Sequence, residues 1–369
     1  MSVFRLVLAM LLVACSARAQ TAPPREALDG IDPVVLLTQG KEISGKADLK
    51  VVRDKFTYLF ATPENKAAFE KSPEKYEIQL SGACARMGGG VTGNPADYAV
   101  VDGKIYIFGS DDCHKKFVAA PAKFLPKPAP PMPSTAAALS QGRALVERAV
   151  KAIGGAEKLD AVTTYVESSS QVQKRPTGDV PIKVKTMWRF PGDIRAERTT
   201  TLPDRTATSA NLLTPAGGWF IGGGRAYPQN AEGRANAAAG YNRQLVPLLR
   251  ARREADFKAA SLGASTVHGV QVDRVRVRQG ALDVTLAIDK ASGLIHSMSF
   301  TGRGLDSEIG DYILVLGDYR DVSGLRLPFS ERALFNGAPD TLLSRTLDAI
   351  AINVPLDDAL FQPGPGGVQ

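Results

Sequence analysis

The chain has 369 residues, which is long for one small domain and suits two. Its residues are 44% hydrophobic and 22% charged, a globular balance that excludes a disordered or fibrous protein. The formal net charge of +7 is a modest excess without any groove-reading motif, so we expect no nucleic-acid partner.

Residues 1–19 have the pattern of an export signal peptide. Arg5 precedes an apolar run from Leu6 to Ala14, and Ala17-Arg18-Ala19 supplies the small residues that a signal peptidase reads. The run is shorter than the roughly 20 residues that cross a bilayer. We therefore predict a periplasmic or secreted protein cleaved before Gln20. A lipid anchor through Cys15 is the alternative, because Leu12-Val13-Ala14-Cys15 resembles a lipoprotein box.

Residues 125–135, LPKPAPPMPST, form the predicted linker. Five prolines in this segment hold the backbone extended and prevent it from packing as helix or sheet. The linker separates a first domain, 26–124, from a second domain, 136–363.

The first domain contains an internal repeat. FTYLFATPENKAAFEKSPEKY (56–76) aligns with KIYIFGSDDCHKKFVAAPAKF (104–124). Each copy predicts an alternating strand, a cap at Thr62 or Ser110, and a short helix. The segment between the copies predicts a glycine-rich loop and then a hairpin with its turn at Asp102-Gly103.

These segments, with LDGIDPVVLLTQGKEISGKADL (28–49), SGACA (81–85) and GNPADYAVVDGKIY (93–106), resemble exported members of the YHS-domain family. The resemblance covers nearly all of the first domain and implies a small α+β module. The Tyr-His-Ser triplet that names the family is absent. Metal-binding relatives present a Phe-Cys-Ser-x-x-Cys turn, of which residues 108–113 keep only the second cysteine.

Cys84 and Cys113 are the only cysteines beyond the predicted signal peptide. An even number of cysteines in an oxidising compartment favours a disulfide bridge, worth about 3–4 kcal/mol for a loop of this size. Cys84, Cys113 and His114 also offer ligands for zinc or copper, which is the alternative and the only cofactor that the sequence suggests. A free thiol with a lowered pKa at a helix start is the third interpretation.

The second domain begins with an amphipathic helix over residues 136–153 that ends at Gly154-Gly155. From Val162 the hydrophobic pattern has period two, and at least nine segments separated by turn residues predict one large antiparallel sheet. A second helix is predicted around 243–260. A sheet of this size curls, so we expect an α+β fold in which a half-open barrel is covered by helices.

The segments VERAVKAIGGAEKLDAVTTYVESSSQ (146–171), LAIDKASGLIHSMSF (286–300), GDYRDVSGLRLPF (317–329) and AIAINVPLDDALFQP (349–363) are similar to periplasmic lipoprotein carriers of the LolA/LolB-like superfamily. The similarity implies the same half-open barrel and a lipid-like ligand. None of that family's ligand-contacting residues can be matched position by position here.

Large side chains and a basic helix are the candidates for the ligand site. Trp188, Trp219 and Phe220 either line an apolar cavity or fill a core. In the helix predicted around 243–260, Leu249 lies on the apolar side, and Arg250 and Arg253 on the basic side. Such a helix over a cavity could meet an anionic headgroup or a membrane surface, and the alternative is a packed helix with a solvated basic side.

No catalytic constellation is visible in the sequence. His268 and His296 have no Ser, Cys or carboxylate spacing that completes a triad. We therefore predict an exported, non-enzymatic binding protein for a lipid-like or other apolar molecule. A metal-binding envelope protein and an enzyme with a site at the domain interface are the alternatives.

Overall fold

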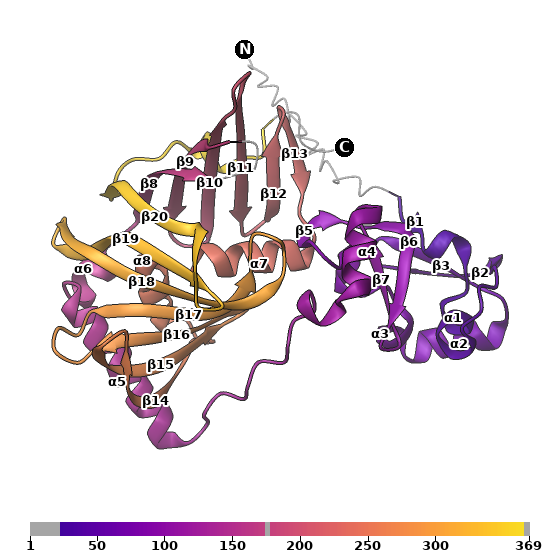
Figure 1. Cartoon of the computed structure of the whole chain (residues 1–369), viewed down its shortest axis with the longest axis horizontal. Helices are drawn as coiled ribbons and strands as arrows, with labels where there is room; N and C mark the ends of the chain where they lie inside the picture. The colour runs from indigo at the N-terminus through magenta and orange to yellow at the C-terminus, as the bar shows by residue number, and fades with distance from the viewer. Residues whose placement is uncertain (1–22, 174–177, 365–369) are drawn as a thin grey trace, which may run out of the picture.

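The computed structural model describes residues 23–173 and 178–364, which form two domains side by side (Figure 1). The predicted signal peptide and Cys15 lie outside the described residues. None of the described helices combines the length and apolar character that a membrane crossing needs.

The first domain is a small α+β unit with two sheets. One sheet has the order β1-β3-β2 and the other the order β5-β4-β7-β6. Its strands are β1 (Arg25–Glu26), β2 (Lys46–Arg53), β3 (Phe56–Phe60), β4 (Ala83–Cys84), β5 (Gly88–Thr92), β6 (Asn94–Val101) and β7 (Lys104–Phe108). Its helices are η1 (Leu28–Gly30), α1 (Pro33–Gln39), α2 (Pro63–Lys71), α3 (Pro73–Tyr76), η2 (Leu80–Gly82), α4 (Asp111–Ala119) and η3 (Pro121–Lys123).

The two copies of the predicted repeat have similar local structure. Strands β3 and β7 are each followed by a helix whose first turn is capped from the predicted residue. The Thr62 hydroxyl accepts from the backbone N–H of Asn65 at 3.2 Å, and the Ser110 hydroxyl accepts from that of Cys113 at 3.4 Å. The turn at Asp102-Gly103 has positive φ at both residues, as a two-residue hairpin with this sequence requires.

The second domain is built on one sheet of 13 strands in the order β13-β12-β11-β10-β9-β8-β20-β19-β18-β17-β16-β15-β14. The strands are β8 (Thr164–Gln173), β9 (Val180–Arg189), β10 (Asp193–Thr201), β11 (Thr206–Thr214), β12 (Gly217–Gly222), β13 (Arg225–Pro228), β14 (Lys258–Val267), β15 (Val270–Gln279), β16 (Leu282–Asp289), β17 (Ile295–Arg303), β18 (Ile309–Val322), β19 (Leu325–Phe335) and β20 (Ala338–Ile352). The helices are α5 (Ala136–Ala152), α6 (Ala156–Asp160), α7 (Ala231–Tyr241), α8 (Leu245–Arg250), η4 (Ala251–Arg253) and η5 (Asp358–Phe361).

This order confirms the predicted curled, antiparallel and unclosed sheet. Two meanders, β8–β13 and β14–β20, join where the first strand pairs with the last, β8 with β20. The free edges are β13 and β14, although these strands follow each other in the chain. Helices α7 and α8 connect them and lie inside the curl (Figure 1).

The prediction of one helix around 243–260 is wrong in its extent. The helix α8 ends at Arg250, because the chain must leave the helix for β14 to pair with β15 from Lys258 onward. The longer helix of this region is α7, which was not predicted from the sequence. Its sequence AEGRANAAAGY has no apolar stripe, but the Asn230 side chain caps it by accepting from the backbone N–H of Gly233.

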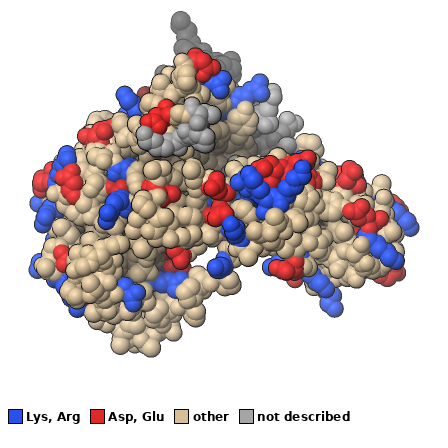
Figure 2. Space-filling model, in the orientation of Figure 1, with Lys and Arg blue, Asp and Glu red and all other residues tan. Residues whose placement is uncertain are grey.

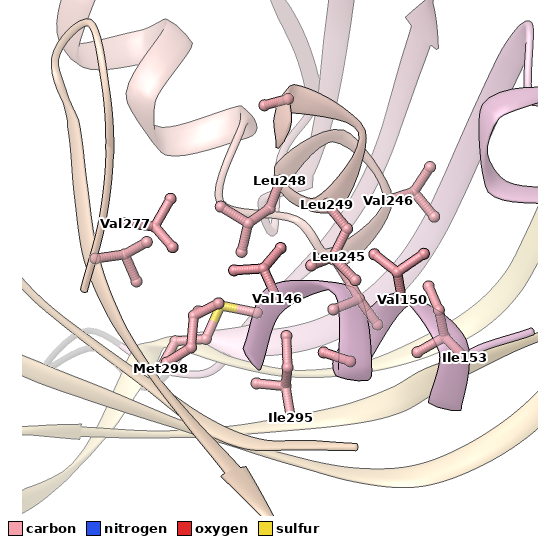
Figure 3. Packing of buried hydrophobic residues seen from close by; sticks show 14 of the residues in the cluster. Val146, Val150, Ile153, Leu245, Val246, Leu248, Leu249, Val277, Ile295 and Met298 are labelled. Atoms are coloured by element: carbon pink, nitrogen blue, oxygen red, sulfur yellow. The ribbon is translucent and has the colours of Figure 1, made fainter. Parts of the chain in front are cut away.

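The core of the second domain lies inside the curl. Buried side chains of α5 and α8, including Val146, Val150 and Leu248, pack against inward-facing strand residues such as Met298 (Figure 3). Helix α5 approaches β14 closely at Gly142, where a Cβ atom would lie 2.6 Å from backbone atoms of Ala259. The helices therefore fill much of the concave side with their own apolar side chains.

The two domains meet at the loop between β17 and β18 and where α7 lies against β5 and η2 of the first domain. The Arg303 guanidinium donates to the backbone carbonyls of Arg86 at 2.7 Å and Phe124 at 3.3 Å, both in the first domain. Lys123 forms an ion pair with Glu308 across the same junction. Between Leu125 and Thr135 no helix or strand forms, and the carbonyl of Pro130 accepts from Arg276 on β15 at 2.7 Å.

Candidate functional site in the concave face of the large sheet

A row of directly paired residues crosses the concave face of the β8–β13 meander. From β8 to β13 its members are Glu167, Thr186, Ala196, Asn211, Phe220 and Tyr227. Directly paired residues share one face of an antiparallel sheet. The amide of Asn211 donates to the hydroxyl of Tyr241 at 3.0 Å, so α7 lies over this face.

The outer end of this row is apolar and open to solvent. Phe220 is 44% exposed and Tyr227 is 50% exposed, and they face each other on β12 and β13. Large aromatic side chains are usually covered, so this exposed pair is the candidate surface for a ligand or partner. The concave face thus continues from the buried core to an uncovered aromatic edge.

The inner end of the row is a buried ion cluster. Arg345 on β20 donates through Nε and Nη2 to both carboxylate oxygens of Glu331 on β19, at 2.8 and 2.9 Å. The same Nη2 donates to Glu167 at 2.9 Å and to the side-chain carbonyl of Gln244 at 2.6 Å. Tyr165 donates its hydroxyl to the other oxygen of Glu167 at 2.6 Å.

Burial governs the electrostatics of this cluster. It raises the pKa of Glu167, and the Glu331 carboxylate adds to this effect, although the Arg345 guanidinium opposes it. Burial also opposes the charge of Arg345, but the Glu331 and Glu167 carboxylates outweigh it and raise the pKa of this guanidinium. Glu167 and Glu331 share the Arg345 guanidinium, and the charge of the buried Arg243 also interacts with Glu331.

A hollow of about 370 Å³ opens beside the cluster. It lies where β20 leaves its pairing with β19 between Asp340 and Arg345. Its walls are mostly polar and comprise Ser170, Gln171, Val172, Ser330, Glu331, Arg332, Thr341, Ser344, Arg345 and Thr346. Glu331 and Arg345 are thus among the residues that border this hollow.

The predicted aromatic residues divide between the two faces of the sheet. Trp188 is fully buried in the concave face against Tyr165, with ring centroids 5.2 Å apart, and its indole N–H has no hydrogen-bond partner among the described residues. Phe220 lies on the same face at the open edge. Trp219 points to the opposite face, where it packs with Leu212 and Phe361 under the C-terminal segment.

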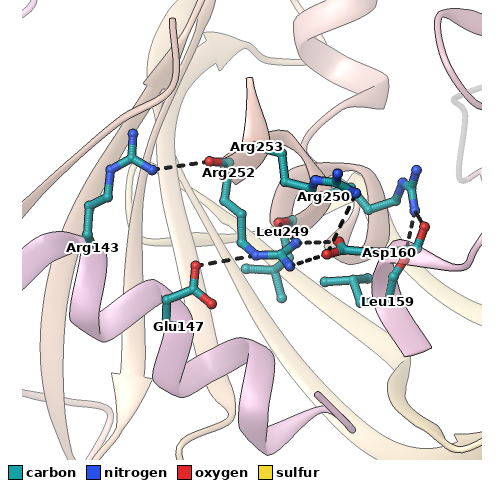
Figure 4. Close-up of polar contacts among 8 residues, drawn as sticks. All are labelled: Arg143, Glu147, Leu159, Asp160, Leu249, Arg250, Arg252 and Arg253. Atoms are coloured by element: carbon teal, nitrogen blue, oxygen red, sulfur yellow. Dashed lines mark hydrogen bonds and ion pairs between the residues drawn. The ribbon is translucent and has the colours of Figure 1, made fainter. Parts of the chain in front are cut away.

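Of the two predicted lid arginines, Arg250 attaches α8 to α6 and Arg253 is exposed. The Arg250 guanidinium donates to the carbonyls of Leu159 and Asp160 at 2.8 Å, at the C-terminal end of α6, and lies over the Phe190 ring. Arg253 is exposed, 3.8 Å from the Asp160 carboxylate, and Leu249 is buried. Arg252, which the sequence analysis did not select, donates to both Asp160 oxygens at 2.8 Å (Figure 4).

A membrane-facing basic side would require these cations to point outward together. On the face shown in Figure 2, acidic and basic side chains are intermingled over both domains. Arg250 and Arg252 are engaged with α6, so a role in binding an anionic headgroup would require α8 to separate from α6.

The two cysteines are brought together. Cys84 at the end of β4 and Cys113 in the first turn of α4 are both buried free thiols, and they lie near enough for each thiol to shift the pKa of the other. His114 is held elsewhere: its Nδ1 lies 2.5 Å from an Asp97 oxygen, and its ring stacks on Phe108. Within residues 23–173 and 178–364 no group of three or more His, Cys, Asp or Glu side chains could hold a metal ion.

The ion cluster could have been found from the sequence pattern. Tyr165, Glu167 and Ser169 alternate on β8, and Leu327, Phe329, Glu331 and Ala333 alternate on β19, all of them buried. A carboxylate in the apolar phase of a strand indicates a buried charge that needs a partner. The partner, Arg345, could not be chosen from the sequence because it is far away in the chain.

No protein-family model and no curated protein matches the chain. Among solved structures, the chain is similar to a DUF1329 family protein from Desulfovibrio piger, with 11% identity, 61% of this chain and 97% of that chain covered, and a TM-score of 0.42. It is also similar to a LolA superfamily protein from Nitrosomonas europaea, with 10% identity, 60% and 97% coverage, and a TM-score of 0.40. A putative outer membrane lipoprotein-sorting protein domain from Vibrio parahaemolyticus gives 9% identity, 60% and 97% coverage, and a TM-score of 0.38. Likeness at this level carries no argument about function.

Proposed function

We propose that this protein is an exported, non-enzymatic binding protein that holds a lipid-like or other apolar molecule against the concave face of the large sheet. The observation that carries the proposal is the exposed pair Phe220 and Tyr227, which extends the apolar lining from the core to solvent. An acyl chain laid over this pair and further into the curl would gain about 0.8 kcal/mol for each methylene removed from water.

Helix α7 is the element that would move to admit such a ligand. Along its length it is mostly half-buried, and the residues that it packs against the core are Ala237, Ala238 and Ala239, with Tyr241 at its end; it also lies against β5 and η2 of the first domain. Small side chains bury little apolar area, so displacing this helix costs less than displacing α5 or α8. The polar hollow beside Glu331 and Arg345 would receive the polar end of the ligand.

Native mass spectrometry of the protein purified from its own envelope tests the proposal directly. We expect a co-purified apolar molecule of defined mass that is released on unfolding. The absence of any bound molecule, together with no binding of added fatty acid or phospholipid, would contradict the proposal.

A titration with the fluorescent probe N-phenyl-1-naphthylamine locates the site. Phe220→Ser and Tyr227→Ser should weaken binding of the probe about tenfold or more together, because each removes much of an aromatic contact surface. The matched control is Val52→Ser, which changes an equally exposed apolar residue on β2 of the first domain. If Phe220→Ser and Tyr227→Ser bind the probe as tightly as Val52→Ser does, the ligand site lies elsewhere.

A further inference from the structure

We propose that Cys113 and Cys84 form a thiol–disulfide exchange centre at the domain junction, with Cys113 as the attacking thiolate, Cys84 as the resolving thiol and Arg86 as the positioning residue. This inference is independent of the proposed ligand site. It goes beyond a static bridge, because it assigns a different task to each sulfur atom.

The geometry around the two sulfur atoms is unequal. Cys113 is the third residue of α4, where helical N–H groups point toward the helix start and favour negative charge. Arg86 Nη1 lies 3.9 Å from the Cys113 sulfur, within hydrogen-bond range for sulfur. Cys84 lies at the end of β4 and is completely buried.

The electrostatics follow this geometry. Burial opposes ionisation of the Cys113 thiol, but hydrogen bonds from Ser110, Arg86 and Cys84 outweigh burial, so the pKa of Cys113 lies below its usual value. Burial raises the pKa of Cys84, in spite of nearby backbone N–H groups. A thiolate beside a protonated thiol is the arrangement that an attacking and a resolving cysteine require.

The exchange needs a disulfide as the oxidant, either a small molecule or another protein, written RSSR. The Cys113 thiolate attacks one sulfur of RSSR, which forms a mixed disulfide and releases RS⁻. Cys84 loses its proton and attacks the Cys113 sulfur, which forms the Cys84–Cys113 bond and releases the second RS⁻. Two electrons pass from the protein to RSSR, and the leaving thiolates take up the available protons.

Arg86 connects the sulfur pair to the other domain. Its Nη2 donates to the backbone carbonyl of Asp306 at 3.1 Å, and the neighbouring Met87 sulfur accepts from the Ser307 hydroxyl at 3.3 Å. Arg86 also lines a hollow of about 400 Å³ between the domains, together with Lys116 and Phe124. Displacement of this one guanidinium would open a path from the hollow to Cys113.

The test uses the full-length mature protein and oxidised glutathione. Wild type should form the internal disulfide with release of two equivalents of reduced glutathione. Cys84→Ser should accumulate a one-to-one glutathione adduct at residue 113, whereas Cys113→Ser should react at least tenfold more slowly. Equal reaction of the two serine variants, or a bridge that oxidised glutathione does not form, would overturn the proposal.

A second measurement isolates the role of Arg86. Thiolate absorbance near 240 nm against pH should show a higher pKa for Cys113 in Arg86→Gln than in wild type, and Arg86→Lys should restore part of the difference. The matched control is Arg320→Gln, which removes an exposed guanidinium far from the sulfur atoms. An unchanged titration in Arg86→Gln would show that Arg86 has only a structural role. These readouts do not depend on ligand binding.

Discussion

The guanidinium of Arg345 on β20 lies 2.9 Å from the carboxylate of Glu167 on β8, across the seam where the last strand of the large sheet pairs with the first. The two residues are 178 positions apart in the chain. A buried ion pair therefore lies at the seam where the two meanders, β8–β13 and β14–β20, pair with each other.

Arg345→Met should lower the free energy of unfolding by about 3–5 kcal/mol, because it leaves two buried carboxylates without their cation. Urea denaturation measures this change. Arg320→Met is the control, since its ion pair with Asp318 is exposed and screened by solvent. An Arg345 variant as stable as the control would mean that water already reaches the cluster.

Gly142→Ala should destabilise the second domain by about 1–3 kcal/mol, because the added Cβ would overlap the backbone of Ala259. The opposite result is expected for Gly240→Ala in α7, where the nearest atom is 3.7 Å away and helix propensity adds up to about 1 kcal/mol. Thermal unfolding of the two variants side by side gives the sign of each effect. Stabilisation by both would show that α5 can shift away from β14.

His296 should make the protein less stable as the pH falls below about 6.5. Burial, and then the positive charge of nearby His268, lower the pKa of His296. As the pH falls, the unfolded chain therefore binds the proton at a higher pH than the folded protein does. The free energy of unfolding decreases until the pH passes the lower pKa of the folded state. The urea midpoints of wild type and His296→Asn are measured from pH 8 to pH 5. If His296→Asn is the less stable protein at pH 8, the difference between the two midpoints should become smaller as the pH falls. A constant difference would contradict the shift.

Arg303→Gln should loosen the junction between the domains, since it removes donors to the carbonyls of Arg86 and Phe124. Small-angle X-ray scattering should then report a larger radius of gyration. Gly88→Ala should disturb the same contact from the first domain. Its added Cβ would lie 2.6 Å from Arg303 Nε, and residue 88 has a positive φ. Unchanged scattering for both variants would place the main attachment of the domains elsewhere.

Local chemistry made much of the fold predictable. Period-two patterns predicted the strands, and Thr62, Ser110 and the Asp102-Gly103 pair predicted the caps and the hairpin turn of the first domain. Helix α7 was missed because neighbouring alanines and glycines carry no apolar period, although Asn230 provides a cap. The face of Trp219 was not predictable, since β12 carries an aromatic side chain on each face, Trp219 on one and Phe220 on the other.

The candidate site was less predictable than the fold. Arg250 and Arg253 were predicted as site residues because of their charge, but Arg250 contacts carbonyls at the end of α6. Glu167, Glu331 and Arg345 come from three strands, and their meeting depends on the pairing of β8 with β20. Pairing between the ends of a long sheet is set by the whole fold, so no local pattern contains it.

Because β8 pairs with β20, the chain must be synthesised almost to its end before the sheet has all its neighbours. A ribosome that has released β8–β13 has made a meander whose concave surface is uncovered and whose inner edge is unpaired. We therefore expect the protein to aggregate when this newly synthesised surface is left unprotected, rather than when any single hairpin fails to form.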